Sequence, residues 1–89
     1  DLEAVLREHP AVAETAVIGV PSEAWGETPV AFVVKRRESV ATADELLQWF
    51  NARVGKTQRL AALQFIDELP RSAIGKVLKR ELRERYSAS

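Results

Sequence analysis

The sequence predicts a small α+β domain, with helices packed on a sheet of about three strands. Two apolar patterns alternate along the chain, residues at helical spacing and short runs rich in β-branched residues. The 89 residues are enough for one hydrophobic core and too few for two. We therefore expect residues 1–89 to form one domain in the order helix, strand, strand, helix, strand, helix.

The first predicted helix has one face made of residues at i, i+3, i+4 and i+7, which are Leu2, Val5, Leu6 and His9. Pro10 should end it. Strands are predicted at 12–20 (VAETAVIGV) and 30–34 (VAFVV). The second run is continuously apolar, which is typical of a central strand covered on both faces. Residues 21–29 (PSEAWGETP) predict a turn-rich loop between them.

The second half of the chain should add a helix, a strand and a last helix. Thr42 followed by Glu45 forms a capping box, and the helical period that follows continues to Gly55. A short strand is predicted at 63–66, followed by a stop at Pro70. Beyond residue 76, the buried stripe of a basic helix is predicted at i, i+4 and i+8, from Leu78, Leu82 and Tyr86.

The composition excludes several classes of protein. The chain has no cysteine and one histidine, so disulfides, cysteine nucleophiles and thiolate or histidine-cluster metal sites are not expected. No apolar run approaches the roughly 20 residues that cross a bilayer, so we expect no membrane span. The lack of cysteine also favours a cytoplasmic location.

Charge is divided unevenly along a chain whose net charge is zero. Residues 1–50 hold four Lys/Arg and nine Asp/Glu, whereas residues 51–89 hold nine and four. This asymmetry predicts an anionic partner near the C-terminal end, such as a nucleotide, a phosphorylated cofactor or nucleic acid. Solvated helix faces are the alternative explanation.

The pair Gly75-Lys76 invites comparison with a phosphate-binding P-loop. That motif needs a glycine at position 70 and a Ser or Thr at position 77, where this chain has Pro70 and Val77. A lysine at the start of a helix still suits an anion, because the helix N-terminus attracts negative charge. Four residues are therefore candidates to meet a phosphate or carboxylate: Arg71, Ser72, Gly75 and Lys76. A solvated lysine is the alternative.

The last helix and Trp25 are two further candidates for ligand binding. The basic last helix resembles a nucleic-acid contact, but Glu81 and Glu84 interrupt it and no aromatic residue lies among its basic residues. We therefore expect no nucleic-acid partner. Trp25, in a loop beside Gly26, is either a lid over the sheet edge or a stacking platform for a flat base.

Residues 70–83, PRSAIGKVLKRELR, resemble the C-terminal signature of the adenylate-forming superfamily, which includes acyl-CoA and aryl-CoA synthetases, luciferases and peptide-synthetase adenylation domains. Residues 1–34 also follow the C-terminal domain of this superfamily, so the resemblance covers essentially the whole chain. The Trp-Gly-Glu element at 25–27 is closer to the acyl-CoA synthetase branch. The resemblance implies a C-terminal lid domain, separated here from a large N-terminal AMP-binding domain.

In similar enzymes the large domain holds ATP, Mg²⁺ and a carboxylic acid, and the small domain delivers a lysine to the reacting centre. The resemblance gives this catalytic role to Lys76, with Arg71, Ser72 and Gly75 supporting its loop. The lysine charge offsets the negative charge that develops as the acid attacks the α-phosphate. The isolated chain should be inactive, and fatty, aromatic and dicarboxylic acids all remain candidate substrates.

Such enzymes then rotate the small domain, withdraw the lysine and present another face to CoA. The resemblance implies Trp25 and Arg59 as CoA-binding candidates, although residues 56–60 (KTQRL) lack the aromatic residue and proline that the family often carries there. A carrier-protein thiol is the alternative acceptor, and a non-catalytic basic binding module is the alternative function. An exposed Lys76 would be within reach of a lysine acetyltransferase and a deacetylase, which are therefore possible partners. Acetylation would remove the charge of the lysine.

Overall fold

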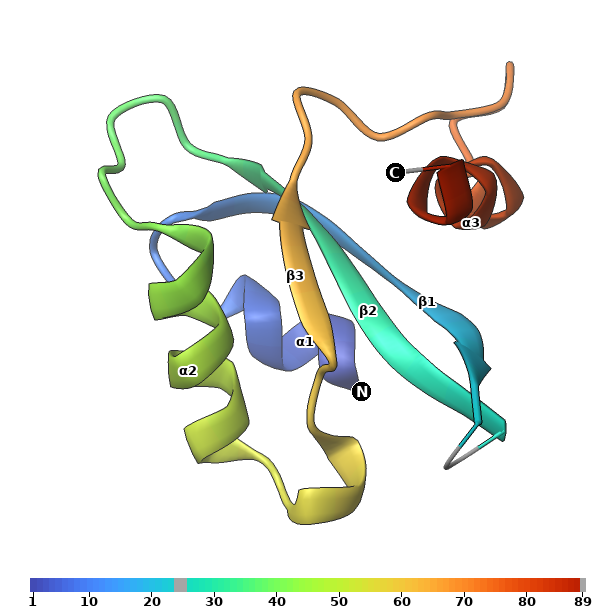
Figure 1. Ribbon diagram of the computed structural model, residues 1–89. Helices are drawn as coiled ribbons and strands as arrows, with labels where there is room; N and C mark the ends of the chain where they lie inside the picture. Colours follow the sequence, from blue (N-terminus) through green and yellow to red (C-terminus); the bar gives the residue numbers. More distant parts are fainter. Residues whose placement is uncertain (24–25, 89) are drawn as a thin grey trace.

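The computed structural model describes residues 1–23 and 26–88 and shows an α+β domain (Figure 1). Its elements follow the predicted order, with one short 3₁₀ helix added. They are α1 (Leu2–Arg7), β1 (Val12–Ser22), β2 (Gly26–Lys35), α2 (Ala43–Arg53), the 3₁₀ helix η1 (Lys56–Gln58), β3 (Ala62–Phe65) and α3 (Lys79–Ala88). The sequence-based fold class is therefore confirmed.

The sheet is mixed and has the strand order β1-β2-β3. Strands β1 and β2 are antiparallel, and β2 and β3 are parallel. The prediction of a central strand is confirmed, because β2 has neighbours on both sides and its residues 30–33 are buried. A continuous apolar run suits such a strand because neither of its faces meets water.

Helices cover both faces of the sheet (Figure 1). Leu6 of α1 and Phe50 of α2 belong to a hydrophobic cluster with Val33 on one face. Leu82 of α3 belongs to a second cluster on the other face, with Phe32. Alternate residues of β2 thus point into two separate cores, as the period of two along a strand requires.

The loop predicted at 21–29 is wrong, because most of it belongs to a β-hairpin. Pro21 pairs with Glu27, and Pro29 pairs with Gly19. Proline is tolerated at Pro21 because β1 is an edge strand. Pro29 lies one residue before the β2–β3 ladder begins, and its carbonyl accepts from the Ala61 amide at 2.9 Å. The missing N–H of Pro29 therefore removes no hydrogen bond from that ladder.

Helix boundaries follow local capping more closely than apolar spacing. The Thr42–Glu45 capping box is present, with both reciprocal hydrogen bonds formed. The first helix ends at Arg7 and not at Pro10. His9 therefore lies beyond the helix, where its Nδ1 accepts from the Ala11 amide at 3.0 Å. This local bond turns the chain toward β1.

The free edge of β1 is covered by side chains from two helices. Glu3 Oε2 accepts from the Val17 amide at 2.8 Å and lies 3.0 Å from Lys79 Nζ. Arg83 Nε donates to the Gly19 carbonyl at 3.3 Å. An uncovered edge is a template for pairing with other chains, so these contacts protect the sheet as well as joining α1, β1 and α3.

Glu3 should make the stability of the domain depend on pH. Partial burial alone would raise the pKa of Glu3, but the Val17 amide bond and the bond and charge of Lys79 outweigh it and lower the pKa from 4.5. A lowered folded-state pKa stabilises the fold above the unfolded value, and this stabilisation is lost as the pH falls through the folded value.

We expect Glu3→Gln to unfold more readily than wild type at neutral pH, and the two stability curves to converge on acidification. Urea unfolding between about pH 7 and pH 3 measures this difference. Glu84→Gln, which removes a carboxylate from an exposed pair on α3, is the control. A constant gap between wild type and Glu3→Gln at all pH values would contradict the role assigned to Glu3.

Candidate functional site

The segment that joins β3 to α3 forms a closed turn, residues 70–78, which we call the lysine loop. The Leu78 amide donates to the Pro70 carbonyl at 2.8 Å, and Arg71 and Val77 form an antiparallel bridge. Figure 1 shows this segment crossing to the α3 side of the sheet and projecting beyond it. The loop is thus a miniature hairpin whose tip stands away from the core.

The position of Lys76 differs from the sequence-based prediction. A lysine at a helix start was expected, but α3 begins only at Lys79. The bonds of Val77 and Leu78 hold those residues in an extended path, so the helix cannot begin earlier. Attraction of an anion by the helix N-terminus therefore does not explain Lys76, because the lysine lies on a loop.

Ser72 brackets the backbone of Lys76. The Ser72 amide donates to the Lys76 carbonyl at 2.9 Å, and the Ser72 Oγ accepts from the Lys76 amide at 3.3 Å. The Gly75 amide donates to the Ser72 carbonyl at 2.9 Å, which closes the turn before the lysine. Both backbone groups of Lys76 are therefore held while its side chain remains exposed.

Gly75 supplies the backbone conformation that the tip needs. Its φ of +86° lies in the left-handed region, which residues with a Cβ rarely adopt. A Cβ at this position would meet no atom within 4 Å, so the constraint on Gly75 is conformational and not steric. The neighbouring Ile74 is 88% exposed. The turn therefore presents Ile74 and Lys76 to the outside.

Arg71 bonds to both the loop tip and the sheet. One guanidinium nitrogen donates to the Gly75 carbonyl at 2.7 Å, and the other lies 2.7 Å from Glu14 Oε1 on β1. No such partner holds Lys76: across residues 1–23 and 26–88, no carboxylate lies within 4.0 Å of its ammonium. Arg71, Ser72, Gly75 and Lys76 are thus brought together as the sequence suggested.

Arg59 lies in a second region, at the opposite edge of the sheet. An open groove of about 640 Å³ is lined by Lys56, Thr57, Arg59, Leu60 and Ala61 and by the start of β2, residues 27–29. Two of these side chains are cationic and one, Glu27, is acidic. The groove has the size and the charge to take the phosphates of a nucleotide-like ligand.

Asn51 of α2 fixes one wall of this groove. Its side-chain amide donates to the Leu60 carbonyl at 3.2 Å, and its carbonyl oxygen accepts from the Leu60 amide at 2.9 Å. The chain that carries Arg59 is thereby tied to a helix of the core. This contact could not be predicted from the sequence, since an Asn inside a helical pattern is usually a surface residue.

Trp25, the other CoA-binding candidate, lies outside the described residues. Glu27, two positions later, lines the groove.

The two regions lie at different ends of the sheet. The lysine loop contacts β1 at Glu14, which is in register with Val34, whereas the groove begins near Pro29. Five residues along a strand correspond to about 17 Å. Since β1 and β3 are also opposite edges, one ligand of ordinary size would not reach both regions at once.

Neither a metal cluster nor a membrane span is found in the part of the chain that the structure describes. No three His, Cys, Asp or Glu side chains there gather closely enough to hold a metal ion. No described helix has both the length and the hydropathy to cross a membrane.

Comparisons with known proteins identify a matching family and several similar proteins. The family model described as "AMP-binding enzyme C-terminal domain" matches residues 1–76. The 4-coumarate–CoA ligase-like 9 of Oryza sativa subsp. japonica is 42% identical over 86 residues, covering 97% of this chain and 16% of that protein. The 2-succinylbenzoate–CoA ligase of Bacillus cereus is 45% identical over 83 residues, covering 93% and 17%.

A solved structure is similar to this chain in its backbone as well as its sequence. ATP-bound MatB from Rhodopseudomonas palustris superposes with a TM-score of 0.88 at 34% identity, over 96% of this chain and 17% of that one. The chain thus spans about a sixth of the length of the proteins that it matches.

Gly75 and Gly55 provide a matched pair for testing the conformation of the loop tip. We expect Gly75→Ala to lower the free energy of unfolding by about 1–2 kcal/mol, the cost of a left-handed residue with a Cβ. Gly55 has a φ of −70° and equally open surroundings, so Gly55→Ala should be neutral or stabilising. Urea unfolding of both variants measures the difference, and equal effects would argue against a left-handed Gly75.

Proposed function

The chain belongs to the family of AMP-binding enzyme C-terminal domains, and on that basis we propose that it is the lysine-delivering part of an acid–CoA ligase. The complete enzyme would convert a carboxylic acid to an acyl-adenylate with ATP and then to an acyl-CoA. The observation that carries this proposal is the lysine loop, in which a well-bonded backbone presents an ammonium group that has no carboxylate partner among the described residues.

Lys76 suits the first half of this reaction. An oxygen of the carboxylate attacks the α-phosphorus of ATP, a new C–O–P linkage forms, and the bond to the bridging oxygen of pyrophosphate breaks. Negative charge grows on the phosphoryl oxygens and the leaving group in the transition state. A positioned cation stabilises that charge more than it stabilises the bound substrates, so it raises the rate of the step.

The names of the relatives indicate the class of substrate. The ligases that match this chain are named for 4-coumarate and 2-succinylbenzoate, and one structural neighbour is described as ATP-bound. We therefore propose a carboxylic acid and ATP as substrates, bound mainly by the part of the enzyme outside this chain. Mg²⁺ would accompany the ATP phosphates, as is usual for phosphoryl transfer.

The groove beside Arg59 suits the second half of the reaction. CoA carries phosphates at its nucleotide end, and Lys56 and Arg59 offer two cations on a firmly attached segment. Trp25, close in sequence to groove residue Glu27, is proposed to stack on the adenine. Because the groove and the lysine loop lie at different ends of the sheet, we propose that the domain rotates between the two half-reactions.

The alternative of a basic binding module is less well supported by the contacts of α3. Lys79 is paired with Glu3, Arg80 lies 3.9 Å from Glu84, and Arg83 donates to Gly19. Much of the positive charge of the helix is therefore engaged within the domain. A carrier-protein thiol remains the alternative acceptor. In that case the carrier protein would contact this domain through a protein–protein surface and not through the nucleotide groove.

Lys76 is exposed at the tip of the lysine loop, where a lysine acetyltransferase could reach it. Acetylation would remove the charge without disturbing the backbone bonds of the loop. We propose this modification as an off-switch for adenylation, reversed by a deacetylase. The cytoplasm, where ATP, CoA and such enzymes are available, is the proposed location.

In the full-length enzyme, we expect Lys76→Ala to reduce ATP–pyrophosphate exchange by at least about a hundredfold, as loss of a key charge-stabilising group does. Thioester formation from pre-made acyl-adenylate should be nearly unchanged, because that step does not use the lysine. Lys35→Ala, which removes a lysine at the end of β2, is the control. Equal loss of both half-reactions would contradict a role confined to adenylation.

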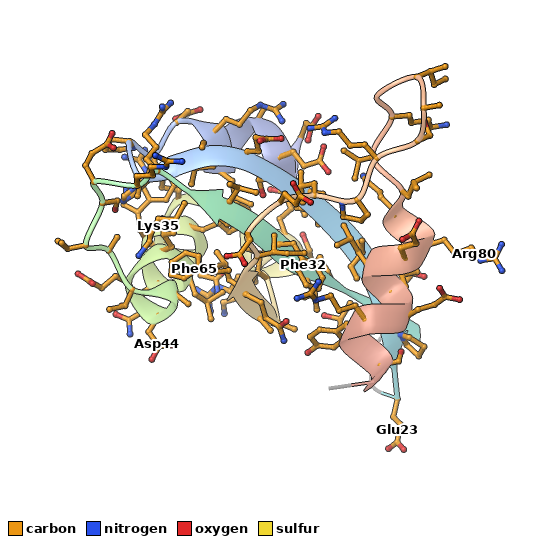
Figure 2. All side chains as sticks on the ribbon, turned by 90° about the horizontal axis from the view of Figure 1, so that it is seen from above. Glu23, Phe32, Lys35, Asp44, Phe65 and Arg80 are labelled. Carbon is orange, nitrogen blue, oxygen red and sulfur yellow. The ribbon has the colours of Figure 1, made fainter. Side chains whose placement is uncertain are left out.

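The acceptor is tested separately. We expect Arg59→Ala combined with Lys56→Ala to raise the KM for CoA by about tenfold or more, because two charge-assisted bonds are lost. ATP–pyrophosphate exchange should not change. Arg80→Ala, which removes an arginine that is 89% exposed and points away from the sheet (Figure 2), is the control. An unchanged KM for CoA together with slower transfer to a carrier protein would favour the carrier-protein alternative.

A further inference from the structure

We propose that Glu14 is a positioning residue for adenylation, which holds the lysine loop in place through Arg71 without contacting a substrate. This inference rests on the proposed role of Lys76. It concerns the contact between Glu14 and Arg71, which are 57 positions apart, and no sequence pattern predicts this contact.

Arg71 connects the loop tip to the sheet through two short bonds. One nitrogen donates to the Gly75 carbonyl at 2.7 Å, and Gly75 directly precedes Lys76. The other nitrogen lies 2.7 Å from Glu14 Oε1. The planar guanidinium holds its donors in a fixed fork, so the position of Glu14 sets the position of the Gly75 carbonyl.

Glu14 is the residue at which regular pairing of β1 with β2 resumes, after a register shift between Val12 and Glu14. It is in register with Val34 on the central strand, and Thr15 beside it is buried, with its hydroxyl donating to the Phe32 carbonyl at 2.9 Å. The chain of contacts therefore runs from the core of the sheet through Glu14 and Arg71 to the residue before the lysine.

The other bonds of the loop cannot replace this link. Those of Ser72 and Gly75 join residues of the loop to one another, and the Leu78–Pro70 bond closes its base. Among the described residues, the Arg71–Glu14 contact is the one hydrogen bond from the loop to the sheet. Val77 also packs against the second hydrophobic cluster, which holds the base of the loop. Without the Arg71–Glu14 contact the base would keep this packing, but the tip would lose its hydrogen bond to the sheet.

Catalysis and stability should respond differently to the loss of this contact. The side chains of Arg71 and Glu14 are 43% and 47% exposed, and ion pairs at such exposure contribute little to folding. A reacting group displaced by about 1 Å, in contrast, can lose about a hundredfold in rate. A positioning role therefore predicts slower adenylation in a domain that is as stable as before.

The test uses the full-length enzyme that carries this chain, with the variants Glu14→Ala, Glu14→Gln and Arg71→Lys. Glu84→Gln is the matched control, because it removes the carboxylate of another exposed ion pair that does not touch the loop. Three quantities are measured for each: kcat and KM of ATP–pyrophosphate exchange, the rate of thioester formation from pre-made acyl-adenylate, and Tm.

We expect Glu14→Ala to lower the kcat of exchange by about tenfold to a hundredfold, with the KM for ATP, the thioester step and Tm unchanged. Glu14→Gln keeps an acceptor oxygen and should lose less. Arg71→Lys cannot bond to both partners and should resemble Glu14→Ala. Glu84→Gln should match wild type.

Two results would overturn the inference. Equal losses in both half-reactions, or a lowered Tm that parallels the lost rate, would show that Glu14 is merely structural. Full exchange activity in Glu14→Ala would show that the loop needs no link to the sheet. Lys76→Ala is assayed in parallel, so that failure of the positioning role can be told from failure of the proposed function. If Lys76→Ala abolishes exchange while Glu14→Ala does not, only the positioning role is wrong. If Lys76→Ala is also fully active, the proposed function is wrong as well.

Discussion

Burial of the central strand is the constraint on which the rest of the structure depends. Strand β2 is paired along both edges, and its residues 30–33 are buried between two hydrophobic clusters. Helices α1 and α2 must therefore pack on one face and α3 on the other. This arrangement obliges the chain to cross from β3 to the far face before α3 can begin, and the lysine loop is that crossing (Figure 1).

The same constraint separates the two candidate surfaces. The groove forms where β2 and β3 start, next to η1, whereas the lysine loop contacts β1 beside the other end of β2. The sheet lies between them, and the residues that line the groove are not those of the lysine loop. A domain built in this way can serve two successive reactions by turning as a body, with little change inside it.

Elements with a strong local pattern are predictable from the sequence. The capping box at Thr42 and the apolar run of β2 specify their elements within a few residues, and both are confirmed. Boundaries that depend on hydrogen bonds between distant residues are not predictable in this way. Pro21 lies on the free edge of β1 and Pro29 lies one residue before the β2–β3 ladder begins, so neither proline removes a ladder hydrogen bond. Helix α3 starts late because Val77 pairs back with Arg71. Glu14 was not among the predicted site residues, because its partner lies 57 positions away. Lys76 was a candidate anion ligand from its place beside Gly75, whereas its catalytic role and the choice of Arg59 came from the family resemblance and stay predictions.

The claim that the charge of Lys76 acts in adenylation can be tested most directly by chemical replacement. The chain has no cysteine, so Lys76→Cys introduces a single thiol here, in a full-length enzyme whose other accessible cysteines have been replaced. Alkylation with bromoethylamine restores an ammonium group at nearly the original length, whereas iodoacetamide adds a neutral group. A charge-based role predicts that ATP–pyrophosphate exchange returns only after aminoethylation. Equal recovery with both reagents, or full activity before either, would contradict it.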